Sequence, residues 1–133
     1  MIINRRQFLL LTAAAVAGCR TMKDGATAVV ARERLVDAGP AGDYAADGVY
    51  SRFRDQGFFV VRNGEKLFAV SAICTHRKCR LAAGADRSFL CPCHGSVFNL
   101  GGKVLKGPAQ RDLPVFTVSM DESGQLLVRI PVT

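Results

Sequence analysis

Two short segments rich in cysteine and histidine constrain this chain more than any other feature. The first box runs Cys-Thr-His-Arg-Lys-Cys from Cys74 to Cys79, and the second runs Cys-Pro-Cys-His-Gly-Ser from Cys91 to Ser96. Together they hold both histidines of the chain and four of its five cysteines. Thiolates and imidazoles are ligands for transition metals. The boxes therefore predict a metal centre, and the fold must bring both loops to it.

The residues of the two boxes leave several ligand sets open. One set combines two thiolates with two imidazoles: Cys74, His76, Cys91 and His94. Such a set holds a [2Fe–2S] cluster with the cysteines on one iron and the histidines on the other. Cys79 and Cys93 then remain, one in each box, and in an exported protein they can form a disulfide. Alternatively, Cys79 or Cys93 is itself a ligand, or all four box cysteines form a zinc site with the histidines spare.

Histidine ligation has a redox consequence. A cluster with two neutral imidazoles is uncharged when oxidised, so it accepts an electron more readily than an all-cysteine cluster. Its potential lies roughly between −150 and +300 mV, whereas plant-type ferredoxins lie near about −400 mV. The chemistry predicted from the boxes is therefore one-electron transfer.

The two boxes resemble those of high-potential, disulfide-containing Rieske proteins. That class includes the iron–sulfur subunits of cytochrome bc1 and b6f complexes and the small subunit of arsenite oxidase. The resemblance covers about residues 29–132. It implies an all-β Rieske fold of antiparallel sheets, with a small cluster-binding subdomain at about residues 72–110. It also implies a Rieske [2Fe–2S] cofactor on the four ligands named above and a disulfide between Cys79 and Cys93.

Five further residues gain roles from this resemblance. Ser96 matches a serine whose hydroxyl donates a hydrogen bond to a bridging sulfide, and Pro108 lies in a loop that covers the cluster from a third side. Phe98 stands where a tyrosine often donates to a ligand sulfur, which implies a lower potential than in the bc1 type. Arg77 and Lys78 replace an apolar Leu-Gly cap where quinol docks. A charged pair there makes a poorer surface for quinol.

The net charge of +7 gathers around the boxes. Between Cys74 and Arg111 the only acidic residue is Asp86, and the basic residues are Arg77, Lys78, Arg80, Arg87, Lys103, Lys106 and Arg111. Such a rim favours reduction of the cluster and can steer an acidic redox protein; its alternative role is that of an ordinary solvated surface. Nucleic acid is excluded as a partner, because an exported protein does not meet it and no aromatic residues are interleaved with the cations.

Residues 1–18 read as an export signal. Arg5 and Arg6 precede an apolar stretch from Phe8 to Ala17, and this pattern resembles a twin-arginine signal, which carries folded cargo. A general secretory signal is the alternative. No apolar run reaches the 18 or more residues of an ordinary membrane-spanning helix.

Cys19 follows Val-Ala-Gly, a pattern that resembles a bacterial lipobox. Lipidation there predicts a protein held on a membrane by acyl chains, with residues 19–28 as a tether. Cleavage after Ala17 or retention of the signal as an anchor are the alternatives. The predicted location is membrane-anchored, beyond the bacterial inner membrane, on the periplasmic side or at the cell surface.

The remainder, residues 29–133, reads as β-structure. The clearest signal is Asn63-Gly64 between two β-rich runs, which predicts a hairpin with a type I′ turn. A second hairpin is predicted over Val115–Met120 and Gln125–Ile130, a first strand over Val29–Glu33, and a loop over Ala38–Gly48.

The sequence thus predicts an exported, membrane-tethered Rieske protein that transfers single electrons. The rival hypotheses are a Rieske subunit of a quinol–cytochrome c reductase or of a molybdenum oxidase such as arsenite oxidase, and a metal-binding module without redox chemistry. We expect an electron-transfer protein or an oxidoreductase subunit rather than a stand-alone enzyme.

Overall fold

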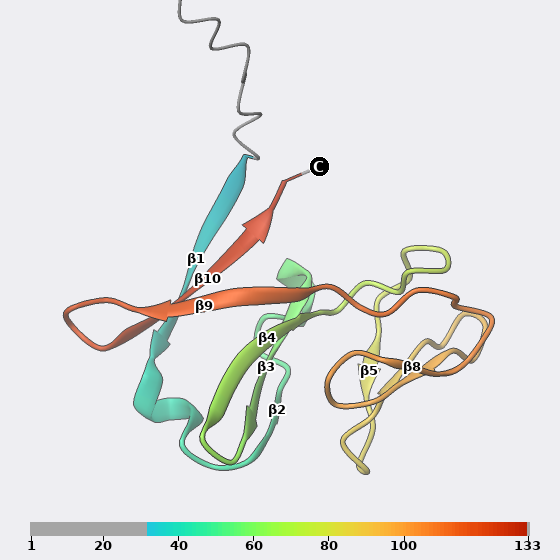
Figure 1. Ribbon diagram of the computed structural model, residues 1–133, viewed down its shortest axis with the longest axis horizontal. Coiled ribbons are helices and arrows are strands. Elements are labelled where there is room, and N and C mark those ends of the chain that lie inside the picture. Colours follow the sequence, from blue (N-terminus) through green and yellow to red (C-terminus); the bar gives the residue numbers. More distant parts are fainter. Residues whose placement is uncertain (1–31, 133) are drawn as a thin grey trace, which may run out of the picture. The chain divides into compact units, whose positions relative to one another are not determined.

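The computed structural model describes residues 32–132, and they form antiparallel β-structure (Figure 1). The strands are β1 (Glu33–Pro40), β2 (Gly48–Tyr50), β3 (Phe58–Asn63), β4 (Lys66–Ser71), β5 (Ala82–Ala83), β6 (Phe89–Leu90), β7 (Val97–Phe98), β8 (Val104–Lys106), β9 (Val115–Met120) and β10 (Gln125–Pro131). Two short 3-10 helices accompany them, η1 (Ala41–Tyr44) and η2 (Arg54–Gln56). The predicted all-β fold is confirmed. None of the described helices is long and apolar enough to cross a membrane.

The strands form two sheets. The large sheet has the order β1-β10-β9-β4-β3-β2 and the small sheet the order β5-β6-β7-β8. Strand β9 joins the two halves of the large sheet, because its first residues pair with β4 and its later residues pair with β10. In sequence the small sheet is an insertion between β4 and β9, and in Figure 1 its labelled strands β5 and β8 (yellow and orange) lie to the right of β4. Both boxes belong to this insertion.

Strand β3 is the shared wall of two hydrophobic cores. Its first four residues, Phe-Phe-Val-Val, are completely buried. Phe58 and Val60 pack in one core with Leu126 of β10. The alternate residues of β3, among them Phe59, pack in a second core with Phe89 of the small sheet. A continuous apolar run is what a strand buried on both faces requires, so β3 and β4 form the layer on which the small sheet rests.

The first hairpin is present, but its predicted turn is wrong by one residue. Asn63 pairs with Lys66, so the two-residue loop is Gly64-Glu65. Gly64 has φ +63°, whereas Asn63 does not have a positive φ. Glycine at the first loop position is the preference of a type II′ turn rather than the predicted type I′. The glycine N–H also donates to Asp47 Oδ1 at 2.9 Å, an interaction that a local pattern does not reveal.

The second predicted hairpin is confirmed. Residues 29–31 of the predicted first strand lie outside the described residues, and the strand that is described begins at Glu33 and extends beyond the predicted end. Strand β1 runs to Pro40, so it includes the start of the predicted Ala38–Gly48 loop. It pairs with β10 from Glu33 to Asp37, and an irregularity between Asp37 and Pro40 absorbs the change of register. Ala38 is fully buried in the core that covers this face of the sheet. Long-range pairing therefore overrides the loop composition.

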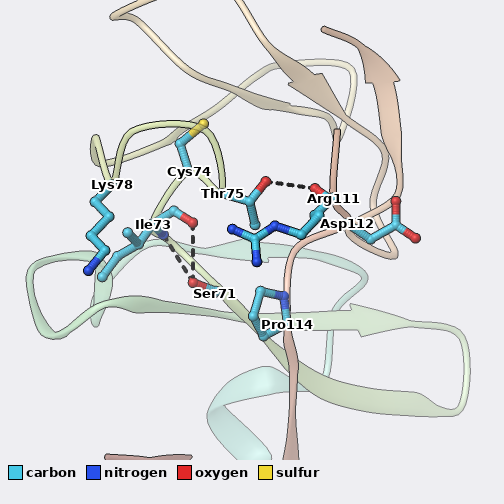
Figure 2. Close-up of a pocket in the computed structure, with 8 residues that line it drawn as sticks. All are labelled: Ser71, Ile73, Cys74, Thr75, Lys78, Arg111, Asp112 and Pro114. Carbon is cyan, nitrogen blue, oxygen red and sulfur yellow. Dashed lines mark hydrogen bonds between the residues drawn. The ribbon is translucent and has the colours of Figure 1, made fainter. Parts of the chain in front are cut away.

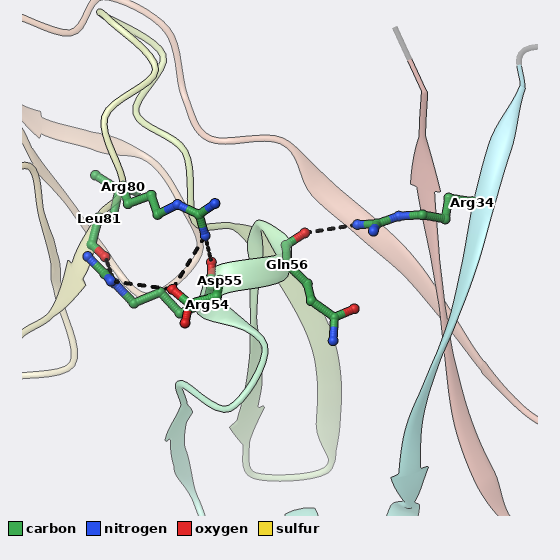
Figure 3. Close-up of polar contacts among 6 residues, drawn as sticks. All are labelled: Arg34, Arg54, Asp55, Gln56, Arg80 and Leu81. Carbon is green, nitrogen blue, oxygen red and sulfur yellow. Dashed lines mark hydrogen bonds and ion pairs between the residues drawn. The ribbon is translucent and has the colours of Figure 1, made fainter.

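Backbone oxygens bound by arginines connect the two sheets (Figure 3). Arg54 of η2 donates from Nε to the Leu81 carbonyl at 2.5 Å, just before β5. Arg80 donates back to the Arg54 carbonyl at 3.1 Å. On the other side of η2, Arg34 of β1 donates to the Gln56 carbonyl at 2.9 Å. The chain that leaves the first box is thereby fixed against the large sheet.

Candidate metal centre

The two boxes have the same backbone frame. In each box the first cysteine makes two backbone hydrogen bonds. Its N–H donates to the carbonyl of the residue five positions later, and its carbonyl accepts from the N–H of the residue four positions later. The distances are 2.8 Å for Cys74 to Cys79, 2.9 Å for Lys78 to Cys74, 2.8 Å for Cys91 to Ser96 and 2.9 Å for Gly95 to Cys91. The fourth following residue has left-handed φ in both, +56° at Lys78 and +78° at Gly95. Two similar tight loops therefore present the candidate ligands.

The frame divides the four predicted ligands into an inner and an outer pair. Cys74 and Cys91 are free thiols and are only 1% and 3% exposed. His76 and His94 are exposed, and their ring centroids lie 5.0 Å apart with the rings at 81°. The backbone N–H of His76 also points to Cys74 Sγ at 3.5 Å. The structure thus brings a pair of imidazoles together at the surface and buries a thiol in each box.

Cys79 and Cys93 form the disulfide that the sequence resemblance implies. It joins the end of the first box to the middle of the second. Both sulfurs are used in this bond, so neither is available as a thiolate ligand. The alternatives with Cys79, Cys93 or all four cysteines on a metal therefore have no support in the structure. The sulfurs of Cys79, Cys91 and Cys93 lie within 4.8 Å of one another, so the bridge lies next to a candidate ligand.

A third segment, residues 107–112, is anchored to both boxes. The N–H of Ala109 donates to Ser96 Oγ at 3.0 Å, and the Thr75 hydroxyl donates to the Arg111 carbonyl at 2.6 Å. Pro108 is exposed and lines a hollow together with His76. The segment that the family resemblance places over the cluster is thus held at two points, and its role as a cover stays a prediction. The Thr75 anchor was missed by sequence reasoning, because nothing local marks a hydroxyl that bonds to a carbonyl 36 residues away.

Comparisons with known proteins identify this arrangement. Residues 34–117 match the Rieske [2Fe-2S] domain. The chain belongs to the Rieske [2Fe-2S] domain family. Its cofactor is therefore a Rieske [2Fe–2S] cluster.

Several relatives of this Rieske chain are named as iron-sulfur subunits of cytochrome b6-f complexes. The chloroplastic cytochrome b6-f complex iron-sulfur subunit of Arabidopsis thaliana is 37% identical over 102 residues, which cover 74% of this chain and 43% of that protein. The cytochrome b6-f complex iron-sulfur subunit of Chlorobaculum tepidum is 37% identical over 94 residues, covering 69% and 51%. The chain thus spans about half the length of these relatives.

A solved structure supports the same membership. The crystal structure of the cyanobacterial plasma membrane Rieske protein PetC3 from Synechocystis PCC 6803 superposes with a TM-score of 0.56 at 37% identity. The match covers 70% of this chain and 97% of that one. The Rieske domain itself, rather than one sheet of it, is therefore the common structure.

The side chains around the boxes fit a Rieske cluster. Ser96 is completely buried, and its oxygen accepts from Ala109 while its own hydrogen has no protein acceptor among the described residues. That hydrogen is available to a sulfide. Phe98 is also fully buried, in the same core as Cys74 and Cys91, and adds no hydrogen-bond donor there. Two free thiols, two adjacent imidazoles and a spare buried hydroxyl form a donor set that suits this cofactor.

Proposed function

We propose that this protein is a one-electron carrier whose cluster is held by Cys74 and Cys91 on one iron and by His76 and His94 on the other. The observation that carries this proposal is the twin-loop frame, with a buried free thiol in each loop and the imidazoles at 5.0 Å. When bound, the cluster supplies one-electron oxidation and reduction.

The surrounding residues act as a rigid holder in this proposal. The Cys79–Cys93 disulfide links the two loops covalently. The hydroxyl of buried Ser96 can donate a hydrogen bond that stabilises negative charge on a cluster sulfur. Phe98 offers no such bond, so we infer a potential below that of proteins with tyrosine there. Arg77 and Lys78, both exposed, add positive charge that favours reduction.

A second candidate function is that of a Rieske subunit in a quinol-oxidising complex, and a subunit of a molybdenum oxidase is a further variant. Relatives named as cytochrome b6-f complex subunits at 37% identity favour the first of these. The exposed Arg77-Lys78 pair argues for a carrier with a protein partner, because a charged rim is a poor contact for an apolar quinol. We propose an acidic redox protein, of the cytochrome or oxidoreductase class, as that partner.

We also propose that the carrier is exported and tethered. In this proposal residues 1–18 are a twin-arginine signal, Cys19 carries a lipid, residues 19–28 are the tether and residues 29–133 form the Rieske domain. The signal and the tether lie outside the described residues, so the sequence pattern alone supports this part. The relative described as a plasma membrane Rieske protein is consistent with it.

Spectroscopy of ligand variants tests the ligand set. The purified protein should contain two irons and two sulfides per chain and have a midpoint potential well above about −400 mV. Both His76→Ala and His94→Ala should lose the Rieske visible and EPR spectrum, whereas Phe68→Leu, a change in the large sheet, should retain it. A potential near that of plant-type ferredoxins, or histidine variants with an unchanged spectrum, would contradict the proposal.

Cell fractionation tests the export and the tether separately. Replacing Arg5 and Arg6 with lysine should keep the protein in the cytoplasm. Cys19→Ser should leave the cluster spectrum intact and release the exported protein from the membrane fraction. Export that persists in the lysine variant, or membrane binding that persists without Cys19, would contradict this part alone.

A further inference from the structure

A hollow lies beside the first box, on the side of Cys74. Its volume is about 530 Å³. It is lined by residues of the β4 end, the first box and the returning chain: Ser71, Ile73, Cys74, Thr75, Lys78, Arg111, Asp112 and Pro114 (Figure 2). The hollow therefore gives a molecule at the surface access to the immediate vicinity of a proposed cluster ligand.

Two cations of this hollow are held on fixed backbone. Lys78 donates its N–H to the Cys74 carbonyl at 2.9 Å, and the Arg111 carbonyl accepts from the Thr75 hydroxyl at 2.6 Å. In Figure 2 the Lys78 ammonium lies beside Ile73, and the Arg111 guanidinium reaches toward Ser71. Neither side chain makes an ion pair within residues 32–132. Within the described residues both charges therefore have no acidic partner and can bind an anion from outside.

The acid in the lining does not neutralise this charge. Asp112 Oδ1 accepts from the Val104 N–H at 2.9 Å, so the carboxylate is engaged with β8. Figure 2 shows it directed away from the Arg111 guanidinium. By contrast, Arg80, which lies nearer the large sheet, forms an ion pair: its guanidinium nitrogen is 3.5 Å from Asp55 Oδ1. The charge of the hollow is thus available to a partner.

The hollow also has an apolar component. Ile73 is 38% exposed, and Pro114 is exposed as well. A site with two cations around an aliphatic side chain matches a carboxylate next to an apolar side chain. A protein surface loop carries this combination, and charge complementarity favours an acidic one.

We propose that this hollow is the docking site of the redox partner, and that it receives a partner loop with an acidic side chain beside an apolar one. The proposal rests on the proposed electron-carrier function and assigns its partner to the Cys74 side of the first box. When bound, the cluster would supply one electron to a partner docked here, with no bond made or broken. Lys78 and Arg111 bind the carboxylate, and Ile73 supplies the apolar contact.

Charge-reversal kinetics test the location. The holoprotein is reduced and then oxidised at low ionic strength by an acidic c-type cytochrome or by hexacyanoferrate(III), each taking one electron. Lys78→Glu/Arg111→Glu should lower both second-order rate constants by about tenfold or more, and added salt should erase the difference. The matched control, Lys66→Glu/Arg87→Glu, makes the same change in net charge at the start of β4 and in the turn before β6, both outside the hollow, and should lower the rate constants by less than about threefold. Equal losses in both double variants would overturn the proposal.

The apolar contact at Ile73 provides a second, independent test of the docking site. Ile73→Ser should slow the reaction with the cytochrome and leave the reaction with hexacyanoferrate(III) unchanged, because the small anion needs no apolar contact. If both rates are unchanged, the hollow does not receive a partner loop.

Cross-linking provides a readout that does not depend on electron transfer. A carbodiimide joins a carboxylate of the bound cytochrome to a lysine within contact distance, and mass spectrometry should find the link at Lys78. Links only at Lys66, Lys103 or Lys106 would overturn the assignment. The cluster spectrum of each protein distinguishes failure of the docking site from failure of the proposed function. A charge-reversal variant that shows the spectrum and reacts at the unchanged rate contradicts the docking site alone. A wild-type protein that lacks the spectrum contradicts the proposed electron-carrier function.

Discussion

The left-handed residues of the two boxes allow a reciprocal test of the twin-loop frame. Lys78 and Gly95 occupy the same position in their loops, with φ +56° and +78°. A side chain in this region is strained, and only glycine adopts it freely. Lys78→Gly should therefore stabilise the protein, and Gly95→Ala should destabilise it, although both changes lie in loops around the same site.

The magnitude follows from two opposing terms. Left-handed φ costs a residue with a side chain roughly 1 to 2 kcal/mol. Glycine loses more conformational entropy on folding than other residues, by roughly 0.4 to 1 kcal/mol relative to alanine. The midpoints of the two terms differ by about 0.8 kcal/mol, in favour of Lys78→Gly and against Gly95→Ala. A Cβ on Gly95 meets no atom within 4 Å, so steric overlap adds nothing to the second value.

The assay is thermal unfolding at one scan rate, with samples matched for iron content. For a domain of this size the two variants should shift the apparent Tm by about 4 °C in opposite directions. Gly42→Ala is the control, because this glycine has no positive φ and no atom within 4 Å of the added Cβ; it should leave Tm equal or slightly raised. A Lys78→Gly variant that melts lower than wild type, or a Gly95→Ala variant that melts at the wild-type Tm, would refute the reasoning.

Three further predictions concern the cluster environment and the hairpin of β9 and β10. Ser96→Ala leaves the buried Ala109 N–H without its acceptor, which should cost about 1 to 3 kcal/mol in thermal unfolding and lower the midpoint potential; an unchanged potential would exclude a role of this hydroxyl toward the cluster. Phe98→Tyr should raise the midpoint potential and Phe98→Leu should not, and a lowered or constant potential in the tyrosine variant would contradict the predicted position of this residue beside a ligand sulfur. Hydrogen bonds from Gln125 first, and then from Ser123, hold the pKa of Asp121 below its ordinary value, so the ionised form favours the folded state. Its contribution is present above the ordinary carboxyl pKa and is lost as the pH falls through the lowered one, so the Tm gap between wild type and Asp121→Asn should be widest at about pH 7 and close in strong acid; a gap independent of pH would contradict this.

The parts of the fold predicted well from sequence are those with strong local signals. Both hairpins follow from turn residues between β-rich runs, and the convergence of the boxes follows from their shared ligand chemistry. The errors come from distant contacts. The loop of the first hairpin shifts to Gly64-Glu65 where Asp47 binds the glycine N–H, and β1 continues through Ala38 because β10 pairs alongside.

In the candidate metal centre, too, features with a local sequence signal were predicted and features set by distant contacts were missed. The two boxes stand out in the sequence because cysteine and histidine are rare in this chain, and the disulfide that the family resemblance implies is present. The repeated frame was not predicted, since Lys78 does not resemble Gly95 in sequence although it takes the same φ region. The role of Arg111 was also missed: it counted as one cation of a rim, and only the Thr75 hydrogen bond shows that its backbone is fixed beside the first box.

The junction between β4 and β9 has a consequence for how such a domain can change over time. Val70 pairs with Val115, and the Ser71 N–H donates to the Pro114 carbonyl at 2.9 Å, so the insertion leaves and re-enters the large sheet at neighbouring points. Lengthening or shortening the inserted loops does not disturb the register of the large sheet. The outward face of β3 and β4, with Phe59 and Val70, nevertheless needs an apolar cover. The segment between β4 and β9 can therefore be exchanged as a unit, but the new segment must supply apolar residues that cover this face of β3 and β4.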